Sequence, residues 1–477
     1  MTEISNNIYS YISSLYGEIE AKKFAEFIQM EPTQYIRVNF LKTDKKRLSE
    51  ILLNVYSIST EEIPNINTAL RLKSKSDILG KTIEHIIGEY YIQSLSSMIP
   101  PLILDPKPND VVLDLCAAPG SKSTELGEMM HNTGTLIANE IALDRVKMLV
   151  YNIDRMNIMN SGTLHYKGEL LSKIYSEHFD KILVDAPCSG LGIVQKKGEV
   201  NNWWSLERAE RLGDLQLRLL IAAIKMIKEG GEVVYSTCTL TPEENEFIID
   251  KVLQKYPVEI QDIEMPVKSR EGFTSYKGNT LNPELIKAKR ILPWEVDSDG
   301  FFIVKLKKTG KTISPELTPP KSGKLKMVNY EKTEMKKILG LIEKDFGISS
   351  EVLNNYKYLI KRNDIYFVNK EWEGVFPDIF ERIGTRFGII DKAGKIILHT
   401  QAAQVLQNEI SRRIFQIETL DDLKIYLEGG TIKNKNIELG QCIVKYKDKI
   451  LGTAIVTTQG IKSRFPRSKR TQEILIQ

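Results

Sequence analysis

The chain has 477 residues, of which 27% are charged and 42% hydrophobic, the composition of a soluble globular protein. This length is too great for a single hydrophobic core and predicts two to four domains. The formal net charge is only +4, which excludes a general polycation, so a nucleic-acid surface must come from local clusters of Lys and Arg. The most apolar stretch, residues 90–104, is interrupted by serines and prolines, so we expect no membrane span. The first residues lack a basic segment followed by an apolar one, so we expect a cytoplasmic protein without a signal peptide.

The sequence of the N-terminal part, residues 1–107, predicts a small α/β module. Apolar spacing predicts helix over residues 1–30, and residues 35–40 alternate like a strand. Thr43 is expected to cap the next helix, and a later helix should end at Leu104.

Residues 108–308 alternate strand and helix, which predicts an α/β domain with a parallel sheet covered by helices on both faces. Residues 309–326 are rich in Lys, Gly and Pro, and this composition predicts a linker. Residues 327–477 then form a unit of short strands with one or two helices. The strands expected in the main domain are 111–115, 135–139, 163–166, 182–184 and 231–239, closed by 300–306.

Two buried strands of this domain end in a cysteine. The run Lys181-Ile-Leu-Val-Asp-Ala-Pro-Cys-Ser-Gly190 breaks at its proline and leaves Asp185 and Cys188 at the carboxyl end, where α/β sheets bind ligands. The run Gly231-Glu-Val-Val-Tyr-Ser-Thr-Cys-Thr239 ends in Cys238. A single cysteine is more often a small buried hydrophobe than a nucleophile. Two thiols at equivalent strand ends favour thiolate chemistry on a substrate.

The remaining cysteines, Cys116 and Cys442, are expected to be structural. All four cysteines are far apart and none forms a C-x-x-C pair, which argues against a zinc site and against a disulfide scaffold. We therefore expect no metal.

The loop Cys116-Ala-Ala-Pro-Gly-Ser-Lys122 joins the first strand of the domain to a helix. Its small residues let backbone amides approach a ligand at the helix N-terminus. It is neither a G-x-G-x-x-G motif nor a complete P-loop, so a tight turn beside a surface acid is the alternative. Glu140, at the end of the second strand, is placed to bind ribose hydroxyls, and the pair favours a nucleoside site.

These motifs resemble those of the Nol/Nop/Sun (RsmB/Nop) family of S-adenosylmethionine-dependent RNA cytosine-5 methyltransferases. The resemblance covers about residues 30–310. The C-terminal unit is similar, more weakly, to the PUA-like RNA-binding extension of some members. The matching segments are Leu113 to Lys122, Asp185 to Gly190, Ser236 to Thr239, Pro242 to Asn245, Arg37 to Asn39, Gln93-Ser94, Arg145, Asn152, Arg155 and Gly300 to Phe302, and in the C-terminal unit 382–384, 402–406, 451–452 and 462–466.

The resemblance implies a Rossmann-like class I methyltransferase sheet and a role for each matched residue. Cys238 would be the nucleophile, Cys188 would help release the product, and Asp185 would contact the target cytosine. Lys122 would be the cation nearest the thiolate. The S-adenosylmethionine site would consist of Cys116, Ala117, Ala118, Pro119, Gly120, Ser121, Lys122, Glu140, Arg145 and Asp185.

The chain departs from the family pattern at two places. The segment Tyr166-Lys-Gly-Glu169 stands where the family has an Asp near the adenine. Trp294 stands where a histidine is common. The contacts to adenine are therefore left open by the sequence.

Methylation of cytosine at C5 requires a thiolate nucleophile, which the cysteines of the predicted site can provide. C5 is a poor nucleophile until a thiolate adds to C6 and turns C5 into an enamine carbon. The predicted protein is thus a monomeric, cytoplasmic enzyme that methylates C5 of a cytosine in structured ribosomal or transfer RNA. One rival is an amino-group methyltransferase, which typically has an Asn/Asp-Pro-Pro-aromatic loop in place of Asp185 to Cys188. The other is a non-catalytic RNA-binding assembly factor that holds the cofactor.

RNA binding is expected from the modules at both ends of the chain. The base must leave its stack to reach the site, which requires a large contact surface. The basic run Ile461-Lys-Ser-Arg-Phe-Pro-Arg-Ser-Lys-Arg470 is a candidate for such contacts, although a run of charges is usually just a solvated face.

Overall fold

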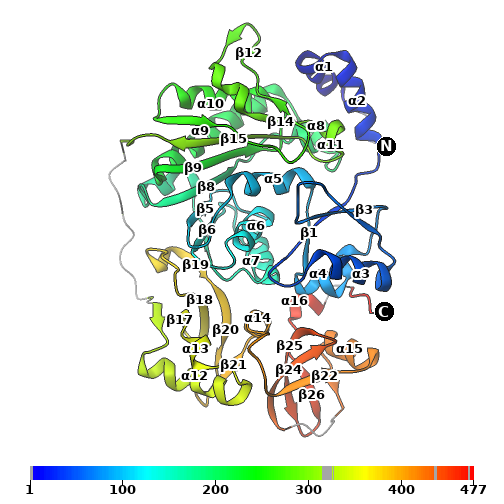
Figure 1. Cartoon of the computed structure of the whole chain (residues 1–477), viewed down its shortest axis with the longest axis vertical. Coiled ribbons are helices and arrows are strands. Elements are labelled where there is room, and N and C mark those ends of the chain that lie inside the picture. The colour runs from blue at the N-terminus through cyan, green and yellow to red at the C-terminus, as the bar shows by residue number, and fades with distance from the viewer. Residues whose placement is uncertain are drawn as a thin grey trace.

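The structure is a computed structural model that describes residues 4–313, 318, 325, 327–433, 438–470 and 473–476. Most of the predicted linker, 309–326, lies outside the described residues. Within the described part of the chain, no helix is long and apolar enough to cross a membrane. Figure 1 shows the main sheet and its helices in the upper part of the view, two smaller sheets in the lower part, and the N-terminal module beside both.

The chain begins with two helices where the sequence predicts one. α1 (Asn6–Tyr16) and α2 (Glu18–Gln29) are separated by Gly17, whose φ of 88° lies in the left-handed region that favours glycine. Ile8, Ile12 and Phe24 are buried in a cluster that also contains residues from the main domain. The helix pair therefore packs onto the main domain.

The N-terminal module is an antiparallel sheet in the order β2-β3-β1-β4. Asp44, not the predicted Thr43, caps α3, because its carboxylate accepts a hydrogen bond from Arg47 N at 2.9 Å. The module contains β1 (Tyr35–Val38), α3 (Lys45–Tyr56), β2 (Thr60–Glu62), β3 (Ala69–Leu72), the 3-10 turn η1 (Leu79–Lys81), α4 (Ile83–Ile87) and β4 (Tyr90–Ile92).

The main sheet has ten strands, with a parallel centre in the order β9-β8-β5-β6-β7. The direction of travel along the sheet reverses between β5 and β8, which is where doubly wound sheets form a ligand crevice. The parallel strands are β5 (Val111–Asp114), β6 (Thr135–Asn139), β7 (Ser161–Leu164), β8 (Phe179–Asp185) and β9 (Ile227–Thr237). The antiparallel strands are β10 (Val258–Gln261), β11 (Arg270–Glu271), β14 (Lys289–Ile291), β15 (Phe301–Lys308) and β19 (Phe380–Ile383), and β12 (Ser275–Tyr276) and β13 (Asn279–Thr280) form a separate hairpin.

Helices cover both faces of this sheet, which confirms the predicted α/β architecture. Alternate strand residues face opposite cores: Val112 lies in one hydrophobic cluster and Leu113 in the other. Residues of α5 (Leu95–Leu104), α6 (Ser121–Met129) and α7 (Leu143–Met156) belong to the first cluster. Residues of α9 (Leu206–Met226) and α10 (Glu246–Leu253) belong to the second. The shorter elements are α8 (Val200–Trp203), α11 (Pro293–Val296) and the 3-10 turns η2 (Gly168–Lys173), η3 (Leu191–Ile193), η4 (Pro242–Glu244) and η5 (Pro283–Lys287).

The C-terminal part forms two five-stranded sheets and has more helices than the one or two predicted. The first sheet contains β16 (Met327–Asn329), β17 (Tyr356–Lys361), β18 (Asp364–Asn369), β20 (Thr385–Ile390) and β21 (Ile396–Leu398). The second contains β22 (Ile414–Ile417), β23 (Thr431–Ile432), β24 (Gly440–Tyr446), β25 (Lys449–Thr457) and β26 (Gly460–Ser463). Their helices are α12 (Thr333–Phe346), α13 (Ser350–Leu353), α14 (Thr400–Val405), α15 (Leu420–Leu427) and α16 (Arg467–Arg470), with the 3-10 turn η6 (Pro377–Ile379).

One C-terminal strand belongs to the main sheet. β19 pairs antiparallel with β7 and covers what would otherwise be an open edge. Asn369 donates hydrogen bonds to the carbonyls of Asn132 and Gly134, at 3.0 and 2.9 Å. Trp372 and Phe380 are buried in the same core cluster as the sheet. The division at residue 308 remains a prediction, but the sheet itself includes a strand from beyond it.

The C-terminal part also binds the N-terminal module through two buried lysines. Lys449 donates to both carboxylate oxygens of Glu89, each at 2.6 Å. Lys469 donates to the carbonyl of Ile86 at 2.7 Å, near the C-terminus of α4, where a cation is favoured. Lys469 therefore forms a contact between modules and is buried, so it is not part of an exposed basic surface. Lys462, Arg464 and Arg467 of the same run are exposed.

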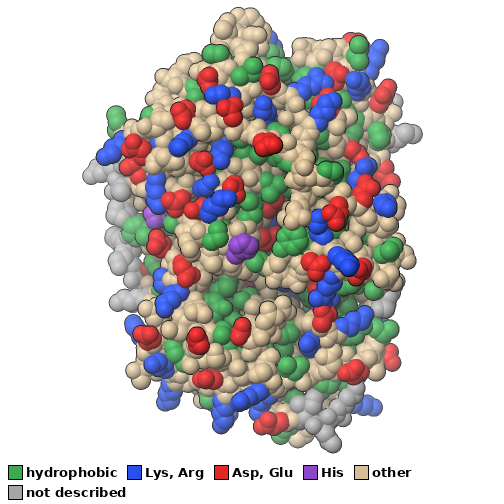
Figure 2. Space-filling view, in the orientation of Figure 1, with side chains coloured by type: hydrophobic (Ala, Val, Ile, Leu, Met, Phe, Trp, Pro, Cys, Tyr) green, Lys and Arg blue, Asp and Glu red, His purple; other side chains and the backbone are tan. Residues whose placement is uncertain are grey.

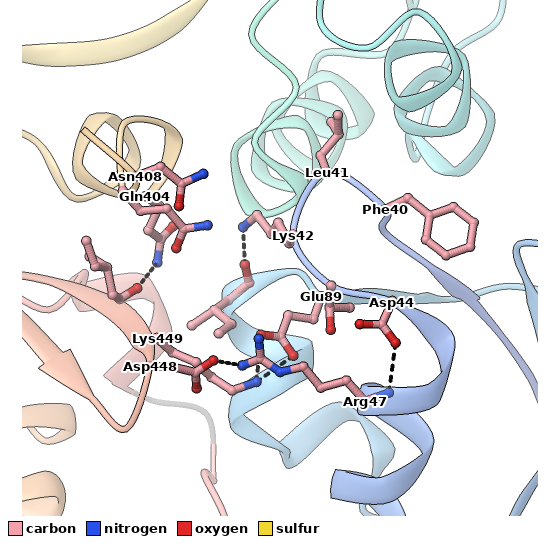
Figure 3. Close-up of a pocket in the computed structure, with 14 residues that line it drawn as sticks. Phe40, Leu41, Lys42, Asp44, Arg47, Glu89, Gln404, Asn408, Asp448 and Lys449 are labelled. Atoms are coloured by element: carbon pink, nitrogen blue, oxygen red, sulfur yellow. Dashed lines mark hydrogen bonds and ion pairs between the residues drawn. The ribbon is translucent and has the colours of Figure 1, made fainter. Parts of the chain in front are cut away.

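A polar cleft of about 450 Å³ lies between these two parts (Figure 3). Its cations already have partners: Arg47 pairs with Asp448, and Lys42 donates to backbone carbonyls. On the face shown in Figure 2, Lys and Arg side chains are mixed with Asp and Glu, without a large area of one sign. The low net charge of the sequence thus corresponds to a mixed surface on this face.

Candidate functional site

The carboxyl ends of β5, β6, β8 and β9 surround one pocket of about 470 Å³. It lies at the point where the strand order reverses, as expected for a doubly wound sheet. Its lining residues are Leu115, Cys116, Ala118, Asn139, Glu140, Ile141, Arg145, Gly168, Glu169, Asp185, Ala186, Pro187, Cys188, Gly190, Ile193, Lys197, Val200, Trp203, Leu215, Leu219 and Cys238. The pocket thus brings both predicted thiols together with the predicted nucleoside site.

The two thiols are in direct contact. The Sγ atoms of Cys188 and Cys238 lie 3.0 Å apart, although the residues are 50 positions apart in the chain. The hydrogen bond with Cys238, followed by burial, raises the pKa of the Cys188 thiol well above its ordinary value. Cys188 is therefore held as a neutral thiol.

A buried carboxylate, Glu244, holds the two cysteine loops together. Its Oε1 accepts hydrogen bonds from Ser189 N at 2.8 Å and Gln216 Nε2 at 2.9 Å. Its Oε2 accepts from the hydroxyls of Ser189 and Thr241. Ser189 directly follows Cys188, and its hydroxyl lies 3.0 Å from that of Thr239, which directly follows Cys238. Glu244 therefore fixes the residue next to Cys188, which in turn contacts the residue next to Cys238.

Burial raises the pKa of Glu244, despite these hydrogen bonds. Gln216 extends the same network, because its Nε2 also donates to the Pro187 carbonyl at 2.8 Å. The Tyr235 hydroxyl donates to the Glu244 carbonyl at 2.6 Å. The network thus reaches both strands that carry the thiols.

Asp185 is the charged group beside the thiols. Its carboxylate pairs with Lys122 Nζ at 2.8 Å and accepts a hydrogen bond from the Ser236 hydroxyl at 2.8 Å. Lys122 also donates to Ser97 Oγ at 3.0 Å. Burial alone would lower the pKa of Lys122, but Asp185 raises it above the ordinary lysine value, and Cys238 contributes in the same direction. A buried, positively charged lysine therefore acts electrostatically on Cys238.

Glu140 lies at the end of β6 and is 3% exposed. Its carboxylate accepts a hydrogen bond from Ala142 N at 2.9 Å and pairs with Arg145 at 3.2 Å. Arg145 also donates to the carbonyl of Ala118, so it joins the Glu140 carboxylate to the loop after β5. The acid and the loop are thus on one wall of the pocket, as the nucleoside-site prediction requires.

The loop 116–122 contributes to the pocket only in part. Cys116 and Ala118 line it. Gly120 starts α6 with a φ of 107°, and a Cβ there would lie 3.1 Å from Leu149 Cδ1, so glycine is favoured for both reasons. Ala117, Pro119, Gly120, Ser121 and Lys122 are not among the lining residues. Lys122 instead reaches Asp185 from behind the loop.

Of the two departures from the family pattern, the segment 166–169 contributes to the pocket and Trp294 does not. Gly168 and Glu169 line the pocket, so the segment after β7 does contribute to it. Trp294 lies elsewhere: its indole donates to Glu20 at 2.6 Å and its ring packs 5.3 Å from Phe24. Trp294 therefore anchors the N-terminal helices.

Cys442 is buried, and burial raises its pKa to about 12. Cys116 lines the pocket, and burial also raises its pKa. Among the described residues, no group of three or more His, Cys, Asp or Glu is arranged to hold a metal ion.

Several residues of the pocket and of the network behind it were not predicted from the sequence. Leu215 and Leu219 reach the pocket from α9, although their apolar helical spacing indicates only a core face. Ser236 and Glu244 stand within motifs that carried the family resemblance, so their motif positions were the available signal. Trp203, Lys197 and Asn139 had no distinguishing sequence signal.

The strand order and the crevice at the reversal define a Rossmann-like methyltransferase. A family model described as 16S rRNA methyltransferase RsmB/F matches residues 101–307, and one described as the N-terminal domain of 16S rRNA methyltransferase RsmF matches residues 4–95. The chain is 32% identical to the ribosomal RNA small subunit methyltransferase F of Shewanella piezotolerans, over 97% of this chain and 96% of that protein. The chain belongs to the RsmB/F methyltransferase family.

Other relatives match slightly less than two thirds of the chain. The tRNA (cytosine(49)-C(5))-methyltransferase of Pyrococcus abyssi is 35% identical over 61% of this chain and 92% of that protein. A solved methyltransferase homologue from Pyrococcus horikoshii superposes with a TM-score of 0.56 at 32% identity, covering 62% of this chain and 92% of that chain.

Proposed function

We propose that this protein methylates C5 of a cytosine in structured RNA, using S-adenosylmethionine and a covalent bond between Cys238 and C6 of the base. The observation that carries the proposal is the contact between Cys238 and Cys188 at the edge of a nucleoside-sized pocket, beside the Lys122–Asp185 pair. The names of relatives that act on ribosomal or transfer RNA support the substrate class.

The pocket residues fit an S-adenosylmethionine molecule. Glu140 can accept hydrogen bonds from two ribose hydroxyls, because each carboxylate oxygen has more than one acceptor site. Leu215 and Leu219 provide apolar contacts on the opposite side. When bound, this cofactor supplies an electrophilic methyl group.

Cys238 would add to C6 of the cytosine and make C5 nucleophilic. The thiol must be ionised to attack, and the nearby Lys122 ammonium favours the thiolate. The Lys122–Asp185 pair would also stabilise the charge that develops on the base, through hydrogen bonds to its polar edge.

Cys188 would act when the product is released. After the methyl group has been gained, a base, here a solvent water molecule, must take the proton from C5. The C5–H electron pair then forms the C5=C6 double bond, and the C6–S bond returns its electron pair to Cys238. Cys188 is a neutral thiol 3.0 Å from that sulfur, so it can donate a proton to it as it departs. The two adjacent thiols would thus act in two different steps.

The experiment is to incubate the protein with S-adenosylmethionine and unmodified 16S rRNA, and to analyse the nucleosides by mass spectrometry. We expect 5-methylcytidine and no N4-methylcytidine. N4-methylcytidine would support the amino-group rival, and binding of RNA and cofactor without any methylation would support the non-catalytic assembly factor.

Glu140→Ala is expected to weaken S-adenosylmethionine binding about 10- to 150-fold. The reason is the loss of charge-assisted hydrogen bonds to ribose, worth about 1.5–3 kcal/mol. Isothermal titration calorimetry measures this directly. Asp144→Ala is the matched control, because Asp144 is an exposed acid in the first turn of α7 that pairs only with Lys147. Equal affinities for wild type and Glu140→Ala would remove Glu140 from the site.

A further inference from the structure

The rim of the pocket holds an exposed tryptophan that the proposed reaction does not use. Trp203 ends α8, lines the pocket together with both thiols, and is 36% exposed. A Cβ built on Gly190 would lie 3.9 Å from Trp203 Cη2. The indole is therefore held beside the loop that carries Cys188, at the entrance to the site.

The residue next to Trp203 anchors this wall of the pocket. Trp204 is buried, donates a hydrogen bond to Ser189 Oγ at 3.2 Å and packs 4.8 Å from the Tyr11 ring. Leu191, Val194 and Val200 belong to the same hydrophobic cluster. The wall that presents Trp203 is thus anchored to the N-terminal helices and to the Cys188 loop.

Two cations accompany the exposed ring. The Arg208 guanidinium lies over Trp203, 4.3 Å from the ring centroid. Lys197 lines the same pocket. Both side chains are exposed, and within the described part of the chain neither forms an ion pair. An aromatic ring with two free cations matches a ligand that carries both bases and negative charge.

We propose that Trp203 is a stacking platform for the base of a nucleotide adjacent to the target cytosine, with Arg208 and Lys197 contacting the neighbouring phosphates. When the target base leaves its stack, the base next to it loses a stacking partner. An indole at the pocket entrance replaces that partner. This inference rests on the proposed function, because it requires an RNA whose cytosine enters the pocket.

The test uses the full-length protein and a short oligoribonucleotide centred on a cytosine that the wild type methylates. Each nucleotide next to that cytosine is replaced in turn by an abasic one. For the wild type, we expect KM to rise about tenfold at one of the two positions, with kcat nearly unchanged, because one stacked base is lost. Trp203→Ala should show the higher KM on the intact RNA and no further rise with the abasic RNA. Trp203→Phe should retain most of the wild-type response.

Matched controls separate this subsite from a general effect. Arg208→Ala should lower the salt dependence of RNA binding, whereas Arg211→Ala, one turn along α9 and paired with Glu207, should not. Phe40→Ala removes an aromatic ring of similar exposure from the other cleft (Figure 3) and should leave the response to abasic RNA unchanged. Thermal unfolding followed by circular dichroism reports that each variant is folded, because Trp203 lines the same pocket as the proposed cofactor site.

The inference is overturned if Trp203→Ala and the wild type respond equally to abasic substitution at both positions. A KM that Trp203→Ala does not change would also overturn it and would leave Trp203 free to contact a protein. Both results leave the proposed function intact. Failure of the wild type to methylate any cytosine would instead contradict the proposed function.

Discussion

Cys238→Ala is expected to abolish methylation and to form no covalent complex with RNA, because no thiolate remains to add to C6. Cys188→Ala is expected to fail later. It should add to C6 and accept the methyl group, then stall, because the proton donor 3.0 Å from the departing sulfur is missing. Denaturing gel electrophoresis with cofactor labelled in its methyl group should show a labelled protein–RNA complex for Cys188→Ala alone.

The double variant Cys188→Ala/Cys238→Ala serves as the control and should lose the complex. A complex formed by Cys238→Ala but not by Cys188→Ala would reverse the two roles.

Glu244→Ala is the second change with a large expected effect. It removes the carboxylate that holds Ser189, and through it the loop after Cys238, in place. A displacement of about 1 Å at reacting groups can lower the rate about 100-fold, so we expect kcat to fall by that order. S-adenosylmethionine affinity should change little, because Glu244 does not line the pocket. Single-turnover kinetics and calorimetry measure the two quantities.

Two further variants show whether this effect comes from positioning. In Glu244→Gln, the hydroxyls of Ser189 and Thr241 can rotate to accept hydrogen bonds, so the loss in kcat should be smaller. Glu243→Ala removes the adjacent acid, which bonds Tyr11 and Lys277 and contacts neither thiol loop. That variant should lose stability without a comparable loss of kcat. A kcat that stays at the wild-type level in Glu244→Ala would show that the thiols do not need this carboxylate.

The main sheet was predictable because its signals are local. Each parallel strand is a short apolar run, and the sequence places Asp185, Cys188 and Cys238 at the ends of such runs. Parallel strands present their carboxyl ends at one edge, so these residues had to meet there. The 3.0 Å contact between the sulfur atoms was not predictable, because it depends on side-chain packing.

Local sequence patterns do not predict the contacts between modules. Nothing in Phe380–Ile383 distinguishes a strand of its own sheet from a tenth strand of the main sheet. Lys469 reads as part of a basic run, yet it donates to a carbonyl of α4, 383 positions earlier. The break at Gly17 was missed because apolar spacing continues on both sides of it. The pairing of β19 and the contact of Lys469 are each decided by a partner that is remote in sequence, whereas the break at Gly17 is local.

Release of tritium from C5 tests the central claim most directly. The substrate is RNA with cytosine labelled at C5, and the measurement compares tritium released into water with methyl groups incorporated. We expect equal amounts from the wild type and none from Cys238→Ala, because C5 loses its proton only after C6 has been attacked. Methyl incorporation without tritium release would place the methyl group elsewhere on the base and contradict the account.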